Sequence, residues 1–199
     1  GNEESRNRVE IQVQPSSLSR DARLEVTRLI RSGCGVVTPS DLGDIGLSVA
    51  VFFRKIIFEQ LLRFKRLLWK SQEVHHAAGG VHGTALFDTQ GNLIVAREDI
   101  GRHNAVDKVL GYCLIHDVSL SDKILVSTGR ASYEMVTKAI RLGISIVATI
   151  SACTSLAVEL ANEYGITLIG YLRGKRLSIY SRPDRIVGNI SSGDSLSHG

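Results

Sequence analysis

The densest group of charged side chains in this chain of 199 residues lies within residues 97–108. That segment, REDIGRHNAVDK, carries three acidic residues and, with His103 included, four basic ones. A helix is predicted to begin just after Gly101, and the free N–H groups at the start of a helix attract anions. Arg102 and His103 stand at this start, and Asp99 precedes it. The segment therefore predicts an anion-binding junction between a strand and a helix.

Three more junctions with similar chemistry follow predicted strands, in the segments STGRAS, SACTS and YLRGKR. If the strands are parallel, all four junctions lie at the carboxyl edge of one sheet, where open α/β folds bind ligands. Arginine and lysine donate charge-assisted hydrogen bonds to phosphate, and glycine lets backbone approach a ligand closely. The junctions together predict a phosphate-rich or nucleotide-like ligand. The residues that support this prediction are Gly101, Arg102, Ser127, Thr128, Gly129, Arg130, Ser132, Thr154, Ser155, Arg173, Lys175 and Arg176.

Simpler roles remain open for single members of this group. Ser132 and Thr154 also fit as ordinary helix N-caps, and any one arginine also fits as half of a surface ion pair. The carboxylates of Glu98, Asp99 and Asp107 have three possible roles. They orient the arginines, accept hydrogen bonds from a ribose or base, or pair with neighbouring basic side chains.

The three cysteines and one histidine are further candidates for chemistry. Cys34 lies between two glycines in a predicted loop and close to Arg31, so its thiol is expected to be accessible and to favour the thiolate form. Packing is the alternative role for Cys34, as for most cysteines. Cys113 lies on an apolar helix, and Cys153 is either a buried small residue or part of a pocket wall. His82 either faces the same cleft or bonds to local backbone.

The apolar periodicity predicts alternating strands and helices. A strand (9–14) and a helix (19–33) come first, and a long helix over residues 53–74 has a basic outer face that is interpreted as solvated surface. A hairpin is predicted over residues 84–99. Helices and continuous apolar strands then alternate, and the last two strands flank a tight turn at Gly174. This order predicts an α/β fold, a three-layer sandwich with a mixed, mostly parallel sheet.

The bulk composition narrows the class of protein. Hydrophobic residues make up 43% of the chain, enough for a substantial core, and the net charge of +4 is too small for a protein that coats nucleic acid. An odd number of irregularly spaced cysteines predicts neither a disulfide framework nor a zinc site. No apolar run is long enough for a membrane span, and no signal peptide is evident, so we expect a cytoplasmic protein. The expected organisation is a flexible N-terminus (1–8), one domain (9–186) and a disordered tail (187–199).

Long motifs resemble those of a known family. The segments GGVHGTALFD, REDIGRHNAVDKVLG, STGRASYEMVTKA, SACTSLAVELA and TLIGYLRGKRLSIYSRPDRI are similar to the formate dehydrogenase accessory sulfurtransferase family. The similarity extends from Val9 to Ile186. It implies a fold like that of the cytidine deaminases without their zinc, and a homodimer.

The resemblance also implies a function. Members of this family take persulfide sulfur from a cysteine desulfurase onto a loop cysteine. They pass it to the molybdenum bis-(molybdopterin guanine dinucleotide) cofactor of formate dehydrogenase. That cofactor would be the bound substrate here, guanine nucleotides would be partial analogues of it, and neither nucleic acid nor membrane is an expected partner.

The predicted site combines the resemblance with the junction residues. Cys34 matches the family's persulfide cysteine. The predicted cofactor-binding residues are Tyr171, Leu172, Arg173, Gly174, Lys175 and Arg176, which match the family's binding segment, together with His82, Asp99, Gly101, Arg102, His103, Gly129 and Arg130.

Two features depart from the family pattern. Many members carry Cys-x-x-Cys in the loop, whereas Val37 stands in the second cysteine position here. The resemblance also leads us to expect that the family's usual N-terminal segment is absent from this chain. The missing second cysteine supports an alternative, a non-enzymatic chaperone that binds the molybdenum cofactor and hands it over. A nucleotide-modifying hydrolase is a weaker alternative, because no matched base and nucleophile are evident.

Overall fold

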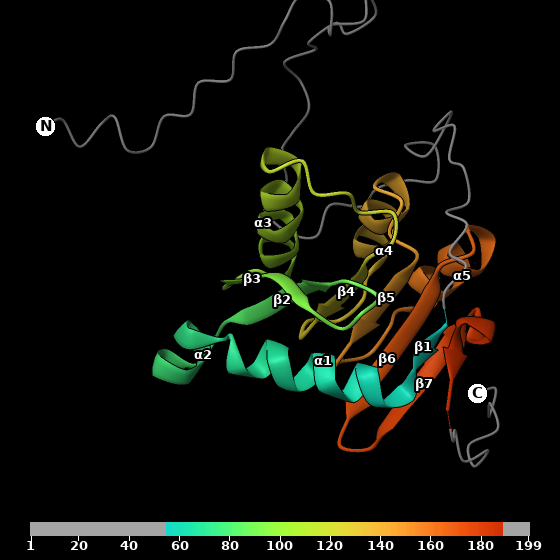
Figure 1. Ribbon diagram of the computed structural model, residues 1–199, viewed down its shortest axis with the longest axis horizontal. Coiled ribbons are helices and arrows are strands. Elements are labelled where there is room, and N and C mark those ends of the chain that lie inside the picture. The colour runs from blue at the N-terminus through green and yellow to red at the C-terminus, as the bar shows by residue number, and fades with distance from the viewer. Residues whose placement is uncertain (1–54, 189–199) are drawn as a thin grey trace, which may run out of the picture. The chain divides into compact units, whose positions relative to one another are not determined.

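The computed structural model describes residues 55–188, which form a six-stranded sheet with helices on both faces (Figure 1). The strands follow the order β3-β2-β4-β5-β6-β7 across the sheet. Their bounds are β2 His82–Phe87, β3 Leu93–Asp99, β4 Ile124–Ser127, β5 Ile146–Thr149, β6 Thr167–Arg173 and β7 Arg176–Ser181. The helices are α1 Phe58–Lys70, α2 Glu73–Ala78, α3 Arg102–Ile115, α4 Tyr133–Arg141 and α5 Ser155–Glu163. A second, two-stranded sheet pairs β1 (Ile56–Ile57) with β8 (Ile186–Val187), and a short 3-10 turn (Pro183–Arg185) precedes β8.

Strand direction determines where the four junctions lie. β4, β5 and β6 are mutually parallel, whereas β2 is antiparallel to both β3 and β4, and β7 is antiparallel to β6. Consequently β3, β4, β5 and β6 all point the same way, although β3 is not hydrogen-bonded to the other three. Their carboxyl ends share one edge of the sheet, as the sequence predicted. The mixed α/β sandwich is likewise confirmed.

The two faces of the sheet are covered by different helices because side chains alternate along each strand. In β4, Leu125 packs toward α3, α4 and α5, while its neighbours Ile124 and Val126 pack toward α1 (Figure 1). Helix α1 fills its face with Leu61, Phe64 and Leu68, which are fully buried. Burying each of these side chains stabilises the fold by about 1.5–3 kcal/mol.

The predicted helix over residues 53–74 is shorter and interrupted in the structure. Ile56 is fully buried and pairs with Ile186 in a parallel strand, so the helix begins only at Phe58. It ends at Lys70, and the chain turns through Ser71 before α2 begins. The apolar pattern was continuous, but β-branched isoleucines also suit a strand, and tertiary pairing decided between the two.

The predicted start of the disordered tail at residue 187 is wrong. Val187 belongs to β8 and pairs with Ile57. The predicted strand at 9–14 and helix at 19–33 lie outside the described residues. No helix in the described part of the chain is long and apolar enough to span a membrane.

Candidate functional site

Asp99 shapes the junction between β3 and α3. Its Oδ1 accepts hydrogen bonds from the Gly101 N–H (2.9 Å) and from Nδ2 of Asn104 (3.1 Å). Its Oδ2 lies 2.6 Å from Nζ of Lys108. The hydrogen bond from Lys108, together with that from Gly101, lowers the pKa of Asp99 to about 2. Asp99 is therefore a constantly charged anchor that holds the loop against the first turns of α3.

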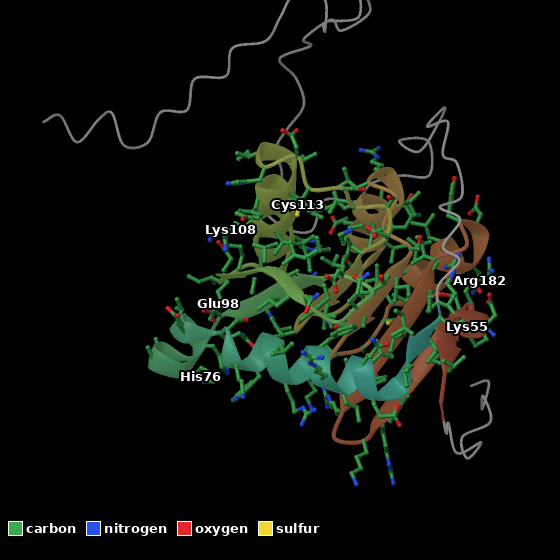
Figure 2. The ribbon with its side chains drawn as sticks, viewed as in Figure 1. Lys55, His76, Glu98, Lys108, Cys113 and Arg182 are labelled. Carbon is green, nitrogen blue, oxygen red and sulfur yellow. The ribbon has the colours of Figure 1, made fainter. Side chains whose placement is uncertain are left out.

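Glu98 has a different role from the one predicted for it. Its carboxylate accepts hydrogen bonds from the N–H groups of Val74 (2.8 Å) and His75 (2.9 Å), and so lies between β3 and the start of α2 (Figure 2). Among the contacts of the described residues, neither Glu98 nor Asp99 is seen to hold the arginines of the REDIGRH segment, whereas pairing with a neighbouring basic side chain is confirmed for Asp99 by its contact with Lys108. The two carboxylates instead satisfy backbone N–H groups at two helix starts, where negative charge is favoured.

Arg102 lies against Gly129 and so brings the first two junctions together. A Cβ atom on Gly129 would lie only 2.6 Å from Cβ of Arg102 and 3.1 Å from its Cδ. Gly129 is also fixed by its own neighbours. Its N–H donates to Oγ of Ser127 (3.2 Å), and its carbonyl accepts a hydrogen bond from Oγ1 of Thr149. Only glycine leaves room here for the Arg102 side chain.

His82 lies beside the same loop, at the start of β2. Its Nδ1 is 3.3 Å from Oγ1 of Thr128, which also accepts a hydrogen bond from the Gly83 N–H (3.0 Å). Burial, and to a smaller extent the positive charge of Arg102, lower the pKa of His82. His82 is consequently a neutral hydrogen-bonding group near neutral pH and a neighbour of Arg102.

His103 faces Glu134, a residue that the sequence analysis did not single out. Nε2 of His103 lies 3.0 Å from Oε2 of Glu134, and both side chains are largely buried. Burial lowers the pKa of His103, and the carboxylate of Glu134 opposes this shift. The pair joins α3 to α4 at the carboxyl edge. A carboxylate two residues after a predicted N-cap was the available sequence signal, because the first turn of a helix favours negative charge.

Backbone contacts join the second junction to the third, and further contacts to backbone carbonyls join the third junction to the fourth. Ala131 and Cys153 form a parallel β-bridge between the loops after β4 and β5. The Tyr171 N–H donates to the carbonyl of Ser151 (2.9 Å), and Nε of Arg173 donates to the carbonyl of Ile150 (2.9 Å). All four junctions are thereby linked along one edge.

The YLRGKR segment divides into parts with different surroundings. Tyr171 has a left-handed backbone (φ 50°) and is 43% exposed, and the guanidinium of Arg173 lies 5.7 Å from its ring centroid. Leu172 is fully buried in the core on the α1 side of the sheet. Leu172 was predicted to bind the cofactor, but its side chain serves as packing. Gly174 (φ 55°) forms the β6–β7 turn, and the side chains of Lys175 and Arg176 are exposed there.

The other side chains predicted at the carboxyl edge differ in their exposure and in their hydrogen bonds. Arg130 is exposed in the β4–α4 loop. Oγ1 of Thr154 accepts a hydrogen bond from the Ala157 N–H (3.3 Å), which confirms Thr154 as an N-cap. Ser132 stands at the N-cap of α4 without capping it. Within residues 55–188 its buried Oγ has no hydrogen-bond partner, so its hydrogen-bonding capacity is unused.

Two of the three cysteines are described, and neither is suited to be a nucleophile. Cys113 is fully buried in α3, and burial raises the pKa of its thiol (Figure 2). Burial raises the pKa of Cys153 to about 12. The Cys153 sulfur packs so closely that a Cβ on Gly170 would lie 3.0 Å from it. Cys34 lies outside the described residues. No group of three or more His, Cys, Asp or Glu side chains within the described range is placed to hold a metal ion.

Comparisons with known proteins agree with the resemblance of the motifs. A model of the FdhD/NarQ family matches residues 2–187. The sulfur carrier protein FdhD of Saccharolobus solfataricus is 43% identical over 180 residues, which cover 89% of this chain and 69% of that protein. The sulfur carrier protein FdhD of Thermoplasma acidophilum is 40% identical over 163 residues, or 81% of this chain and 58% of that protein.

A solved structure shares both fold and sequence. The crystal structure of a protein from Desulfotalea psychrophila, described as a formate dehydrogenase accessory protein, is 36% identical and superposes with a TM-score of 0.64. The match covers 69% of this chain and 58% of that chain, so this chain spans somewhat more than half of its length. Because the family model extends over nearly the whole sequence, this chain belongs to the FdhD/NarQ family.

Proposed function

We propose that this protein is a sulfur carrier that formate dehydrogenase requires for activity. In this proposal a cysteine desulfurase supplies persulfide sulfur, and the protein passes it to the molybdenum bis-(molybdopterin guanine dinucleotide) cofactor, its bound substrate. Relatives bearing the name sulfur carrier protein, and a solved relative described as a formate dehydrogenase accessory protein, support the assignment. We place this activity in the cytoplasm and in a homodimer.

The state of the thiols supports Cys34 as the residue that carries the sulfur. A thiolate is needed to attack the desulfurase persulfide, and burial keeps Cys113 and Cys153 protonated. The Cys34 thiolate takes the terminal sulfur atom, and the desulfurase cysteine leaves as a thiolate. On delivery, the S–S bond breaks and returns Cys34 to its thiolate. The two electrons that reduce the sulfane sulfur to sulfide come from the metal of the substrate. Because Val37 replaces a second loop cysteine, this handover needs no disulfide intermediate within the loop.

The carboxyl edge of the sheet fits the guanine nucleotide arms of that substrate. The observation that carries this proposal is the placement of Arg102 over Gly129, where the first two junctions meet. The side chain of Arg130 and the uncapped start of α4, with its Ser132 hydroxyl, add donors for phosphate. Tyr171 and Arg173 flank the same edge from β6. His82, held neutral, is a hydrogen-bonding group for a polar edge of the nucleotide.

Intact-protein mass spectrometry tests the proposal directly. After incubation with a cysteine desulfurase and cysteine, the protein should gain the mass of one sulfur atom on Cys34. That mass should disappear when the molybdenum cofactor is added.

The alternative function is a chaperone that binds and hands over the cofactor without carrying sulfur. The replacement of the second loop cysteine by Val37 favours it. A protein that binds the cofactor tightly but never acquires the persulfide mass would be this chaperone.

A further inference from the structure

The positive charge of this protein is concentrated on α1 and the β6–β7 turn. Residues 55–70 contain five basic residues and one acidic residue, and residues 173–176 contain three basic residues and no acidic one. The other parts of the chain together hold 16 basic and 19 acidic residues. The overall charge of +4 therefore arises from these two short segments, and without them the chain would be slightly acidic.

The two segments meet in space. A shallow pocket of about 300 Å³ lies between them and is lined by Glu59, Leu62, Lys65, Arg66 and Gly174. Nitrogen-tipped side chains extend outward from α1 and from the β6–β7 turn (Figure 2). Within this region we define the α1 basic face as the four α1 side chains Arg63, Lys65, Arg66 and Lys70. In the described part of the chain none of these four side chains forms an ion pair.

An aromatic side chain stands on the same helix. Trp69 is 53% exposed, although it is the largest apolar residue of α1. Its ring makes edge contacts with His75 and His76, at centroid distances of 5.3 and 4.9 Å. Nε2 of His76 also lies 2.8 Å from the Trp69 carbonyl, which fixes α2 against the end of α1. Trp69 is thus held in place at the surface, and an immobilised aromatic side chain loses little entropy when a partner covers it.

A tryptophan that shares an exposed helix with several arginine and lysine residues has the composition of a protein-binding site. Tryptophan and arginine are enriched among the residues that dominate interface energies, and a charged rim accelerates encounter with an oppositely charged partner. A membrane surface fits less well, because the apolar side of α1 (Leu61, Phe64 and Leu68) is fully buried against the sheet. The preceding segment of this chain is also a poor occupant, since residues 1–54 contain seven acidic and seven basic residues.

We propose that the α1 basic face, with Trp69 as its apolar anchor, is the docking surface for the protein that donates sulfur. This inference rests on the proposed function, which requires a second protein to approach and leave in every cycle. The donor would present an acidic surface, with one carboxylate entering the pocket between Lys65 and Arg66 and an apolar depression covering Trp69. The carboxyl edge of the sheet, on different residues, stays available to the cofactor.

The test measures binding of the full chain to a cysteine desulfurase by biolayer interferometry at several salt concentrations. Lys65→Glu/Arg66→Glu should weaken binding at least tenfold and flatten its dependence on salt, because screened charge pairs are lost. Trp69→Ala should weaken binding about tenfold without changing the salt dependence. Arg141→Glu on α4 is the matched control, since it reverses one charge on the opposite helical layer, and it should bind like the wild type.

GDP affinity and persulfide formation separate this inference from the proposed function. All three variants should bind GDP normally. At low desulfurase concentration, the two α1 variants should acquire persulfide more slowly than the wild type, and at high desulfurase concentration they should recover the wild-type rate.

Unchanged desulfurase binding by both α1 variants, or no binding by the wild type, would refute the docking surface. If an apo-formate dehydrogenase, a short RNA or anionic vesicles lose affinity for these variants while the desulfurase does not, the surface belongs to that partner instead. Failure of the wild type to form any persulfide would refute the proposed function.

Discussion

The side chain of Arg102 lies directly against the backbone of Gly129, so closely that a methyl group on Gly129 would come within 2.6 Å of the Arg102 Cβ. Cβ is attached to the helix backbone, so it cannot move aside as the tip of a flexible side chain can. This contact couples the start of α3 to the loop after β4. It also determines where the Arg102 guanidinium is presented at the carboxyl edge.

Substitution of Gly129 should therefore impair ligand binding. Gly129→Ala should displace Arg102 and lower GDP affinity about tenfold or more, which corresponds to the loss of a charge-assisted hydrogen bond. Isothermal titration calorimetry measures this affinity. Gly111→Ala is the control, because a Cβ on Gly111 in α3 would meet no atom within 4 Å. Gly111→Ala should keep GDP affinity and raise stability by about 0.5–1 kcal/mol. Wild-type affinity in a folded Gly129→Ala variant would contradict the role of this contact.

Charge reversal at Arg130 tests the proposed nucleotide site from a second loop. Arg130 is exposed, so Arg130→Glu should leave the free energy of unfolding nearly unchanged. GDP binding should weaken by about 1.5–3 kcal/mol, the range for a lost hydrogen bond to a charged group. Arg176→Glu at the β6–β7 turn should weaken binding by a similar amount if the turn reaches the same ligand. Equal calorimetric affinities for the wild type and both variants would exclude this nucleotide site.

Asp99 should contribute to stability in a way that depends on pH. Its folded pKa of about 2 lies below the ordinary value of 3.8, so the contribution is complete above pH 3.8 and is lost as the pH falls through about 2. Asp99→Asn should lower the free energy of unfolding by about 1 kcal/mol at pH 7, after allowance for solvent screening of this surface pair. The difference from the wild type, measured by urea unfolding, should shrink between pH 4 and pH 2.

The same substitution should also reduce cofactor loading, because the Gly101 and Asn104 hydrogen bonds orient the α3 junction. Glu163→Gln on the exposed end of α5 serves as the control and should change neither property. An Asp99→Asn variant with normal loading would show that the junction keeps its shape without the charge.

The pair formed by His103 and Glu134 can be followed by NMR. Burial lowers the pKa of His103 below 6.5, and Glu134 partly opposes that shift. The wild-type ring should therefore titrate below pH 6.5, and in Glu134→Gln it should titrate at a still lower pH. Because the folded pKa is lowered, stability should fall as the pH decreases through 6.5 toward that value. A titration midpoint that is unchanged or higher in Glu134→Gln would disprove the contact.

The cysteines should differ sharply in function. Cys34→Ala should abolish sulfur transfer but leave GDP binding close to normal. Cys113→Ala and Cys153→Ala should retain transfer, because Cys113 is buried, Cys153 is partly buried, and burial raises the pKa of both thiols. Formate dehydrogenase activity in cells that lack the native accessory protein measures transfer. Val37→Cys, which restores the common loop pattern, should be tolerated and should form a disulfide with Cys34 under oxidising conditions. Full activity of Cys34→Ala would replace the sulfurtransferase by the cofactor chaperone.

The sequence alone determined the order of elements from residue 82 onward and the family. Apolar runs such as those of β4 and β5 are short, continuous and bounded by turn residues, so their local pattern permits few alternatives. The gathering of the four junctions at one edge also followed from the sequence. A hairpin reverses the chain once, and helices usually connect strands that run in the same direction, so strand direction is constrained by the order of elements.

Tertiary structure decided what local pattern left open. Ile56 and Ile57 suited a helix or a strand, and pairing with β8 selected the strand. Leu172 belongs to the predicted binding segment, but alternation along β6 turns its side chain into the core between Tyr171 and Arg173. Glu98 accepts hydrogen bonds from backbone N–H groups of α2, which lies far from it in the sequence. Asp99 pairs with Lys108 in the following helix, α3. Such choices depend on which side chains meet across elements, and this is set by packing of the whole domain rather than by neighbours in the sequence.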